Sequence, residues 1–302
     1  PGRFNGKDVT VVDVFEGVGK YSSGKMTASA LRKLELKACP SAGACGGQFT
    51  ANTMACVSEA IGLALTNSAM PPAVNTDERK VFAEKSGKAV MHLIDKKIRP
   101  RDIVTIDSLV NAARVVAATG GSTNAALHLP AIANEAGLKF TLKDVVEIYK
   151  STPYIGDMAP GGKYVAKDLY DIGGVPVVIK SLLNGGFING NCMTVTGKTI
   201  AENHKETIFP TNQDVVFECS NPISENSSVV GLWGNLAEEG SISKMICTMV
   251  GSGTKTTKPQ AQMDKPGSPV KWFLGGSILL GLEESWRRGN IQFSKPNMTD
   301  FW

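Results

Sequence analysis

A single cysteine lies between glycines in the stretch Ala42-Gly43-Ala44-Cys45-Gly46-Gly47-Gln48-Phe49-Thr50-Ala51-Asn52-Thr53-Met54. The stretch leads into apolar residues at helical spacing, namely Met54, Val57, Ile61 and Leu65. Glycines let the backbone approach a bound group closely, and a helix start offers unpaired N–H groups and a positive dipole end. Because such surroundings favour the thiolate, we interpret Cys45 as a metal-ligating or reactive residue. A small buried residue in a tight turn is the alternative interpretation.

The chain is long enough for a substantial core, since 42% of its 302 residues are hydrophobic. That length predicts one large or two medium domains. The net charge of +4 comes without a dense run of Lys and Arg, so we expect no nucleic-acid partner. No apolar stretch approaches the roughly 20 residues of a membrane-spanning helix, so we expect no membrane partner. The chain begins at Pro1 without a signal-peptide pattern, and we expect it to begin inside a longer protein.

Six cysteines are spread irregularly along the chain, at positions 39, 45, 56, 192, 219 and 247. A secreted disulfide framework is more regular, and the pair spacing typical of structural zinc sites does not occur. We therefore predict reduced thiols and a cytoplasmic protein, or one of an organelle matrix if the source is eukaryotic. We expect Cys56 to be a core residue of the helix after the glycine turn, and the other cysteines except Cys45 to be structural too.

Helical patterns cover much of the first two thirds of the chain. They predict helices over about 27–37, 54–65, 77–97, 103–118, 125–137, 141–152, 165–172 and 176–183. The helix over 77–97 should bury Val81, Ala89, Val90, Leu93 and Ile94. Ser122 or Thr123 can cap the helix that contains Pro130, where we expect a kink or a late start. Thr141 and Asp144 have the spacing of a capping box.

Strand patterns appear at the start of the chain and again after residue 190. They predict strands over about 7–15, 193–196, 214–218 and 229–233. We expect an α/β fold in which residues 1–210 form a layered α/β/α unit with helices packed on a parallel sheet. Residues 211–250 should be antiparallel and begin a β-barrel-like (swivel) domain. Residues 251–302 have a linker-like start and no assigned structure.

Four motifs, in this order and spacing, resemble one family. They occupy residues 39–54, 120–129, 161–165 with 173–176, and 194–203. Together they are similar to the dihydroxy-acid dehydratase family, which also contains phosphogluconate and sugar-acid dehydratases, and the resemblance covers roughly residues 1–245. It implies an iron–sulfur lyase that removes water from a 2,3-dihydroxy acid to give a 2-keto acid in branched-chain amino-acid biosynthesis.

The resemblance also implies cofactors, a pocket and an oligomer. Cys45 matches a cysteine that ligates an iron–sulfur cluster, expected to be [2Fe–2S] rather than [4Fe–4S], and Mg²⁺ assists the cluster in this family. Candidate substrate-pocket residues are Gly46, Gly47, Ser122, Thr123 and Asn124. The expected partners are a small dihydroxy acid and a second copy of the chain in a homodimer.

The sequence departs from the family pattern in its metal ligands and catalytic groups. It has no Cys-Asp-Lys run and no counterpart of the family's downstream glutamate ligand or proton-abstracting serine. We therefore expect a truncated or inactive version that does not hold the cofactors by itself. Two alternatives remain, a non-catalytic scaffold or assembly remnant and a phosphate or nucleotide site at Thr196-Gly197-Lys198-Thr199. The second lacks the first glycine of a P-loop, because Cys192 stands there.

Overall fold

The computed structural model describes residues 2–43, 45–235 and 237–244, which combine many helices with two short strand pairs. The first pair joins β1 (Gly2–Phe4) and β2 (Lys7–Val9), and the second joins β3 (Val229–Gly234) and β4 (Ala237–Lys244). Both pairs are antiparallel, and the second sets Val229 opposite Lys244. The described residues therefore form a mixed helix and strand fold, as expected at that level.

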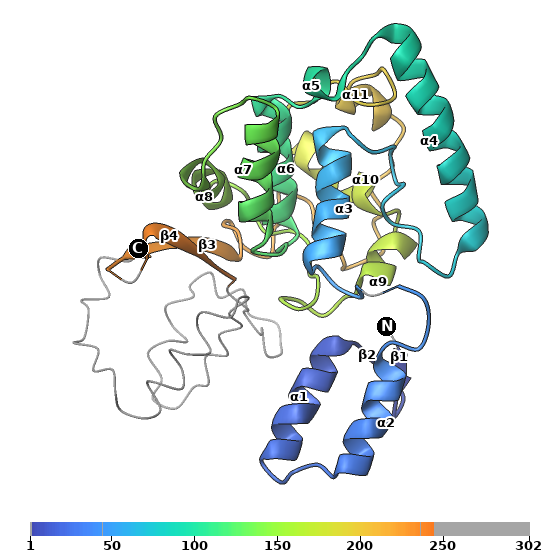
Figure 1. Cartoon of the computed structure of the whole chain (residues 1–302), viewed down its shortest axis with the longest axis vertical. Coiled ribbons are helices and arrows are strands. Elements are labelled where there is room, and N and C mark those ends of the chain that lie inside the picture. The colour runs from blue at the N-terminus through green and yellow to red at the C-terminus, as the bar shows by residue number, and fades with distance from the viewer. Residues whose placement is uncertain (1, 44, 236, 245–302) are drawn as a thin grey trace.

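The main body is built around a central buried helix, α6 (Ile106–Ala118). Most of its side chains are inaccessible to solvent, because other helices pack on several sides of it (Figure 1). The surrounding elements are α3 (Thr50–Ile61), α4 (Thr76–Lys96), α5 (Pro100–Ile103), α7 (Ala125–Glu135), α8 (Leu142–Lys150), α9 (Ala166–Asp171), α10 (Val175–Asn184) and α11 (Ile200–Asn203). The core is one continuous apolar cluster that extends from α3 to β3.

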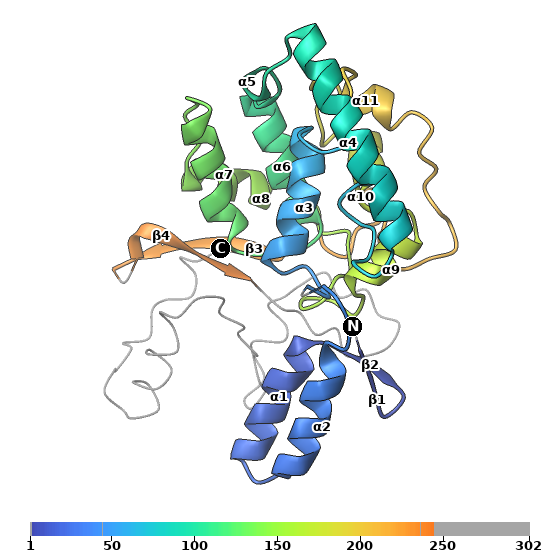
Figure 2. The ribbon, with the colours of Figure 1, turned by 45° about the vertical axis from the view of Figure 1, so that its right-hand side comes forward.

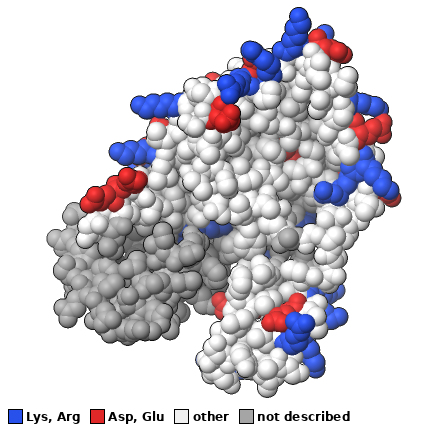
Figure 3. All heavy atoms as spheres, in the orientation of Figure 1, with Lys and Arg blue, Asp and Glu red and all other residues white. Residues whose placement is uncertain are grey.

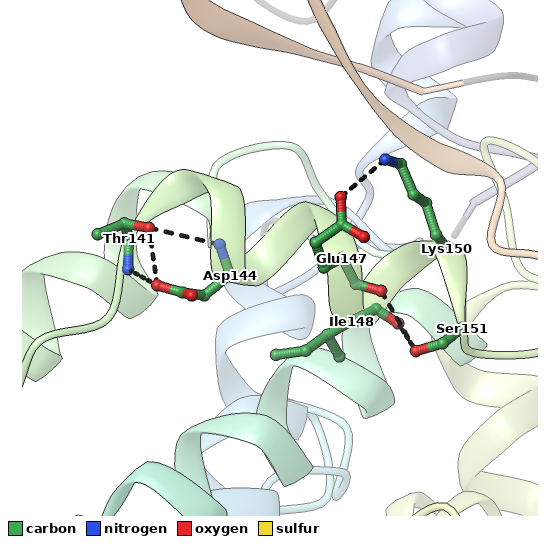
Figure 4. A network of polar contacts seen from close by, with 6 residues as sticks. All are labelled: Thr141, Asp144, Glu147, Ile148, Lys150 and Ser151. Atoms are coloured by element: carbon green, nitrogen blue, oxygen red, sulfur yellow. Dashed lines mark hydrogen bonds and ion pairs between the residues drawn. The ribbon is translucent and has the colours of Figure 1, made fainter. Parts of the chain in front are cut away.

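A capping box starts α8, as the spacing of Thr141 and Asp144 predicts. Figure 4 shows the backbone N–H of Thr141 donating to the Asp144 carboxylate at 2.7 Å, while Thr141 Oγ1 accepts from the Asp144 N–H at 3.4 Å. On the exposed side of the same helix, Lys150 pairs with Glu147 at 2.8 Å. The capping bonds satisfy backbone N–H groups at the start of α8. The apolar face of the helix remains free to pack on α6.

A helical hairpin lies apart from the main body. Figure 2 shows α1 (Val11–Ser22) beside α2 (Ala28–Ala38), with β1 and β2 at one end. The hairpin has its own small core of Val9, Leu34 and Ala38. Gly17 permits the close approach of the two helices, since a Cβ there would lie 2.9 Å from Leu34 Cδ2.

Three predicted strands take other forms. The strand expected over 7–15 ends at Val9, because Thr10 and Asp13 form a capping box that starts α1. Residues 194–197 form a tight turn in which Gly197 has a φ of +75°, and Met193 makes only an isolated antiparallel bridge to Thr199. Residues 214–218 run extended and make only an isolated antiparallel bridge between Val216 and Gly156. Within the described ranges the expected parallel sheet is therefore absent, and α6 occupies the centre instead.

The long helix α4 differs from expectation in burial. Its bounds agree with the prediction, but Val81, Val90 and Ile94 are 47%, 54% and 62% exposed. Charged residues alternate with these apolar ones, and Figure 3 shows acidic and basic side chains side by side along the outer edges of the molecule. Ala89 and Leu93 are half-buried, so the described part of the chain covers the predicted inward face of α4 only in part.

Other helix boundaries are confirmed or adjusted locally. The helix expected over 103–118 is divided, because Thr105 caps α6 and ends α5 before it. Pro130 lies inside α7, which starts at Ala125, so the predicted late start is wrong. The strand over 229–233 is confirmed as β3, and residues 251–302 lie outside the described residues. In the described ranges, no helix combines the length and apolar character that crossing a membrane requires.

Candidate functional site

The glycine-rich turn around Cys45 is held by the helix that follows it. Asn52, in the first turn of α3, donates from Nδ2 to the carbonyl oxygens of Cys45 and Gly47, at 2.9 and 2.8 Å. The Cys45 thiol lies 3.4 Å from the same Gly47 oxygen. Helix α3 begins only at Thr50, so Cys45 lies in the preceding loop and not in the first helical turn. Hydrogen bonds from Asn52 therefore position Cys45 here.

A second loop closes the other side of this turn. The Gln48 backbone N–H donates to the Ala159 carbonyl oxygen at 2.6 Å, and the Ala166 N–H donates to the Gly46 oxygen at 2.9 Å. A Cβ on Gly47 would lie 2.6 Å from the Ala159 oxygen, which is shorter than real Cβ contacts. Glycine at position 47 is thus required by close backbone packing.

The Ser122–Asn124 turn meets the start of α3. Thr53 Oγ1 accepts from the Ser122 backbone N–H at 2.9 Å, and Asn124 Nδ2 donates to Thr50 Oγ1 at 2.5 Å. Ser122 Oγ accepts from the Asn124 N–H at 3.3 Å, which closes a local turn. The N-cap of α7 is Asn124 and makes no side-chain capping bond, so the predicted cap by Ser122 or Thr123 is wrong. Thr123 is half-buried in the same turn. The structure therefore brings the turn at 122–124 to the helix that also holds Cys45.

Behind the turn lies a buried polar layer. Gln48 Nε2 donates to Thr119 Oγ1 at 3.0 Å and approaches Cys56 Sγ at 3.7 Å. Cys56 is 2% exposed, which confirms it as a core residue. Burial raises the pKa of the Cys56 thiol to about 12, and the nearby Glu59 carboxylate adds to the shift. Cys56 is therefore a neutral packing group at neutral pH.

The described residues do not complete a metal site. No group of three or more His, Cys, Asp or Glu side chains among them is arranged to hold a metal ion. Cys39 is exposed, Cys192 is buried and Cys219 is half-buried, while Cys247 lies outside the described residues. Cys45 offers one thiol, and an iron–sulfur cluster needs several protein ligands. The donor set within these ranges therefore does not fit an iron–sulfur cluster or Mg²⁺ by itself.

The candidate phosphate loop has a structural role. Thr196 Oγ1 donates to Asn203 Oδ1 at 2.9 Å, and Thr199 caps the four-residue helix α11 in a capping box with Glu202. These hydroxyls are already engaged in local hydrogen bonds. The geometry gives no support to a phosphate or nucleotide site at residues 196–199.

One residue at this site and one buried residue of β4 were not predicted from the sequence. Asn52 lies within the quoted cysteine motif, but its side chain had no assigned partner. Lys244, at the end of β4, is only 6% exposed. Its alternation with Ile242 on one face of a strand is the signal that could have indicated an inward-facing lysine.

Comparisons with known proteins all match one family. A family model described as dihydroxy-acid/6-phosphogluconate dehydratase N-terminal matches residues 2–203. A protein of Pelagibacter ubique named dihydroxy-acid dehydratase is 66% identical over 236 residues, which cover 78% of this chain and 41% of the relative. A protein of the same name from Parvibaculum lavamentivorans is 61% identical over 245 residues, with 81% and 42% covered. The chain thus spans about two fifths of the length of these curated relatives.

A more distant relative shows the same coverage. The dihydroxy-acid dehydratase of Metallosphaera sedula is 46% identical over 252 residues, which cover 83% of this chain and 45% of the relative. The residues matched by the family model, 2–203, contain the Cys45 turn and the Ser122–Asn124 turn.

Proposed function

This chain belongs to the dihydroxy-acid/6-phosphogluconate dehydratase family, and we propose that it is part of a lyase that removes water from a 2,3-dihydroxy acid. The product is a 2-keto acid, as branched-chain amino-acid synthesis requires. The observation that carries the proposal is the Cys45 turn, clamped by Asn52 on one side and Ala159 on the other. Such a rigid turn suits a metal ligand, because a preorganised thiolate needs no rearrangement to bind.

We assign Cys45 the role of one ligand of an iron–sulfur cluster of the [2Fe–2S] type. The further ligands, and those of Mg²⁺, come from outside the described residues. The 302-residue chain alone should therefore show no dehydratase turnover.

The substrate pocket in this proposal lies between the two turns. Gly46 and Gly47 form one wall, and Ser122, Thr123 and Asn124 form the other. Ser122 and Asn124 carry a hydroxyl and an amide beside Thr50, where they can bind the hydroxyl groups of a small dihydroxy acid. Side chains of this kind fix orientation without adding charge.

The domain arrangement and the assembly belong to the same proposal. Residues 1–210 contribute to a layered α/β/α domain, and β3 with β4 begins a barrel-like domain. The longer protein forms a homodimer, a state that sedimentation equilibrium measures directly. The described cysteines are free thiols, which supports a reducing compartment, the cytoplasm or an organelle matrix.

The decisive test is a chimera. Residues 2–244 of this chain replace the matching segment of the Pelagibacter ubique relative, and the reconstituted protein is assayed for keto acid formed from 2,3-dihydroxyisovalerate. The expected result is turnover and visible cluster absorption, both abolished by Cys45→Ser and retained in Cys56→Ser. A chimera that folds and binds iron normally with Cys45→Ser would overturn the ligand assignment. A folded chimera without turnover would overturn the proposed function.

A further inference from the structure

Gln48 is a buried amide that joins three segments of the site. It is 2% exposed, and burying an amide is costly unless its polar atoms are hydrogen-bonded. Its backbone N–H donates to the Ala159 carbonyl oxygen at 2.6 Å, and its Nε2 donates to Thr119 Oγ1 at 3.0 Å. The residue thus connects the glycine-rich turn after Cys45 to the loop that contains Ala159 and to the end of α6.

The bond between Gln48 and Thr119 has a fixed direction. Thr119 Oγ1 donates its single proton to the Val115 carbonyl oxygen at 2.8 Å, so it accepts from Gln48. An amide supplies the donor that this contact needs, whereas methionine and an ionised glutamate of similar size do not. Position 48 therefore requires an amide for this contact, and a side chain of the right size alone does not replace it.

These contacts close a ring through the three segments. Next to Thr119, the Ala118 carbonyl oxygen accepts from the backbone N–H of Gly156 at 2.9 Å. The same loop continues to Ala159, whose carbonyl oxygen accepts from the Gln48 N–H, and the Gln48 amide returns to Thr119. Without the side-chain bond, the glycine-rich turn would be joined to the end of α6 only through this loop and through α3.

The end of α6 also places the second wall of the proposed pocket. Thr119 follows the helix directly, and the chain then passes through two glycines to the Ser122–Asn124 turn. A Cβ on the second of them, Gly121, would lie 2.9 Å from Thr53 Cγ2, so this passage packs closely on α3. Thr119 is therefore a short and firmly held link between Gln48 and the turn at 122–124.

We propose that Gln48 is a positioning residue that sets the place of the Cys45 thiol relative to the Ser122–Asn124 turn, through its bond to Thr119. That the two turns bind substrate rests on the proposed function, whereas the positioning rests on these contacts alone. Gln48 acts through the backbone of its own turn, three positions after Cys45. Without the bond, the thiol should sample more positions, and a substrate held at 122–124 should be aligned with it less often.

Thiol alkylation of the 302-residue chain tests the positioning without any turnover. With iodoacetamide at about pH 8, Gln48→Met should raise the native-state rate at Cys45 by about fivefold, the effect of one hydrogen bond. Thr119→Val removes the acceptor and should give the same increase, whereas Thr119→Ser keeps the hydroxyl and should retain the wild-type rate. Cys192 is buried and should stay slow in every variant, because it reports general unfolding.

A double variant separates the bond from its surroundings. Gln48→Met combined with Thr119→Val should react no faster at Cys45 than either single variant, because the second change has no bond left to remove. Thr152→Val is the matched control. Thr152 is equally buried, likewise donates to the carbonyl oxygen four residues earlier, and likewise accepts from a side chain, that of Arg114. This control should lower the melting temperature to a similar extent and leave the Cys45 rate unchanged.

Three results would overturn the positioning role. They are an unchanged Cys45 rate in Gln48→Met, an additive increase in the double variant, and an increase that Cys192 or Thr152→Val reproduces.

The chimera separates this role from the proposed function. Gln48→Met should lower kcat/KM for 2,3-dihydroxyisovalerate about tenfold, and Thr119→Ser should stay close to wild type. The expected Cys45 rates together with an inactive chimera would retain the positioning role and reject the dehydratase function. An active chimera in which Gln48→Met keeps the wild-type kcat/KM would retain the function and reject the positioning role.

Discussion

Asn52 holds Cys45 in place through the backbone. Its amide nitrogen donates to the carbonyl oxygens of Cys45 and Gly47, at 2.9 and 2.8 Å, and so fixes the Cys45–Gly46 and Gly47–Gln48 peptide groups. Both bonds come from one side chain of a helix, so α3 fixes the position of the turn. Asn52, in the same motif as the cysteine, is therefore as important to the site as the glycines.

We predict that Asn52→Asp disrupts the turn more than Asn52→Ala does. An ionised aspartate cannot donate, and it would place negative charge against two carbonyl oxygens. The alanine variant should lose about 1–2 kcal/mol of unfolding free energy, and the aspartate variant more. Urea denaturation measures both values. Asn134→Ala, at an exposed position of α7, is the control, and equal stability of Asn52→Asp and wild type would contradict this role.

Gly47→Ala should destabilise the chain by about 1–3 kcal/mol, because its Cβ would meet the Ala159 carbonyl oxygen at 2.6 Å and backbone cannot move aside cheaply. Gly87→Ala in α4 is the matched control, since a Cβ there has no neighbour within 4 Å. That control should be stabilising by about 0.5–1 kcal/mol, because glycine is unfavourable inside a helix. The two melting temperatures must move in opposite directions if the close approach of Gly47 is real.

Local signals in the sequence predicted local structure well. The hydroxyl cap at Thr141 located α8, and patterns that end at glycines located α9 and α10. The predicted strand over 7–15 was wrong beyond Val9. The capping box at Thr10 starts a helix there, despite the β-branched residues that favour a strand. Burial along α4 was also wrong, since an amphipathic pattern predicts a face and not its partner.

Contacts across the chain were not predictable from the sequence. The motif at Cys45 and the turn at 122–124 were both identified as candidates, but their meeting through Thr50 and Thr53 depends on how α3 packs on α6. Lys244 was missed, because a lysine near a strand end is usually solvated. Non-local packing decided each of these positions.

Thiol labelling should separate the cysteines by burial. With the folded chain at about pH 8, iodoacetamide should modify Cys39 and Cys45 well before Cys56, since Cys56 is 2% exposed and burial raises its pKa to about 12. Peptide mass spectrometry measures each rate. After denaturation all three should react alike, which is the internal control. Rapid labelling of Cys56 in the native chain would be incompatible with this packing.

Two buried groups should give opposite pH dependences of stability. Burial raises the pKa of Glu59 to about 7, despite hydrogen bonds from the backbone N–H groups of Ala69 and Asn67, and it lowers the pKa of His204 to about 4. The native state holds the Glu59 proton more tightly than the unfolded chain, so this group destabilises the fold increasingly between about pH 4.5 and 7. The native state binds the His204 proton less tightly than the unfolded chain does, so this group makes the fold less stable as the pH falls from about 6.5 to 4.

The two variants therefore have distinct expected profiles, which urea denaturation at about pH 5 and about pH 7 measures. Relative to wild type, Glu59→Gln should gain stability at pH 7 compared with pH 5, because the cost of ionising a buried carboxyl has been removed. His204→Gln should show the opposite change, because the unfolded state no longer takes up a proton at the lower pH. Asn134→Ala adds no titrating group and should leave the pH dependence unchanged. If Glu59→Gln and His204→Gln change the pH dependence in the same direction, at least one of these two groups is not buried as described.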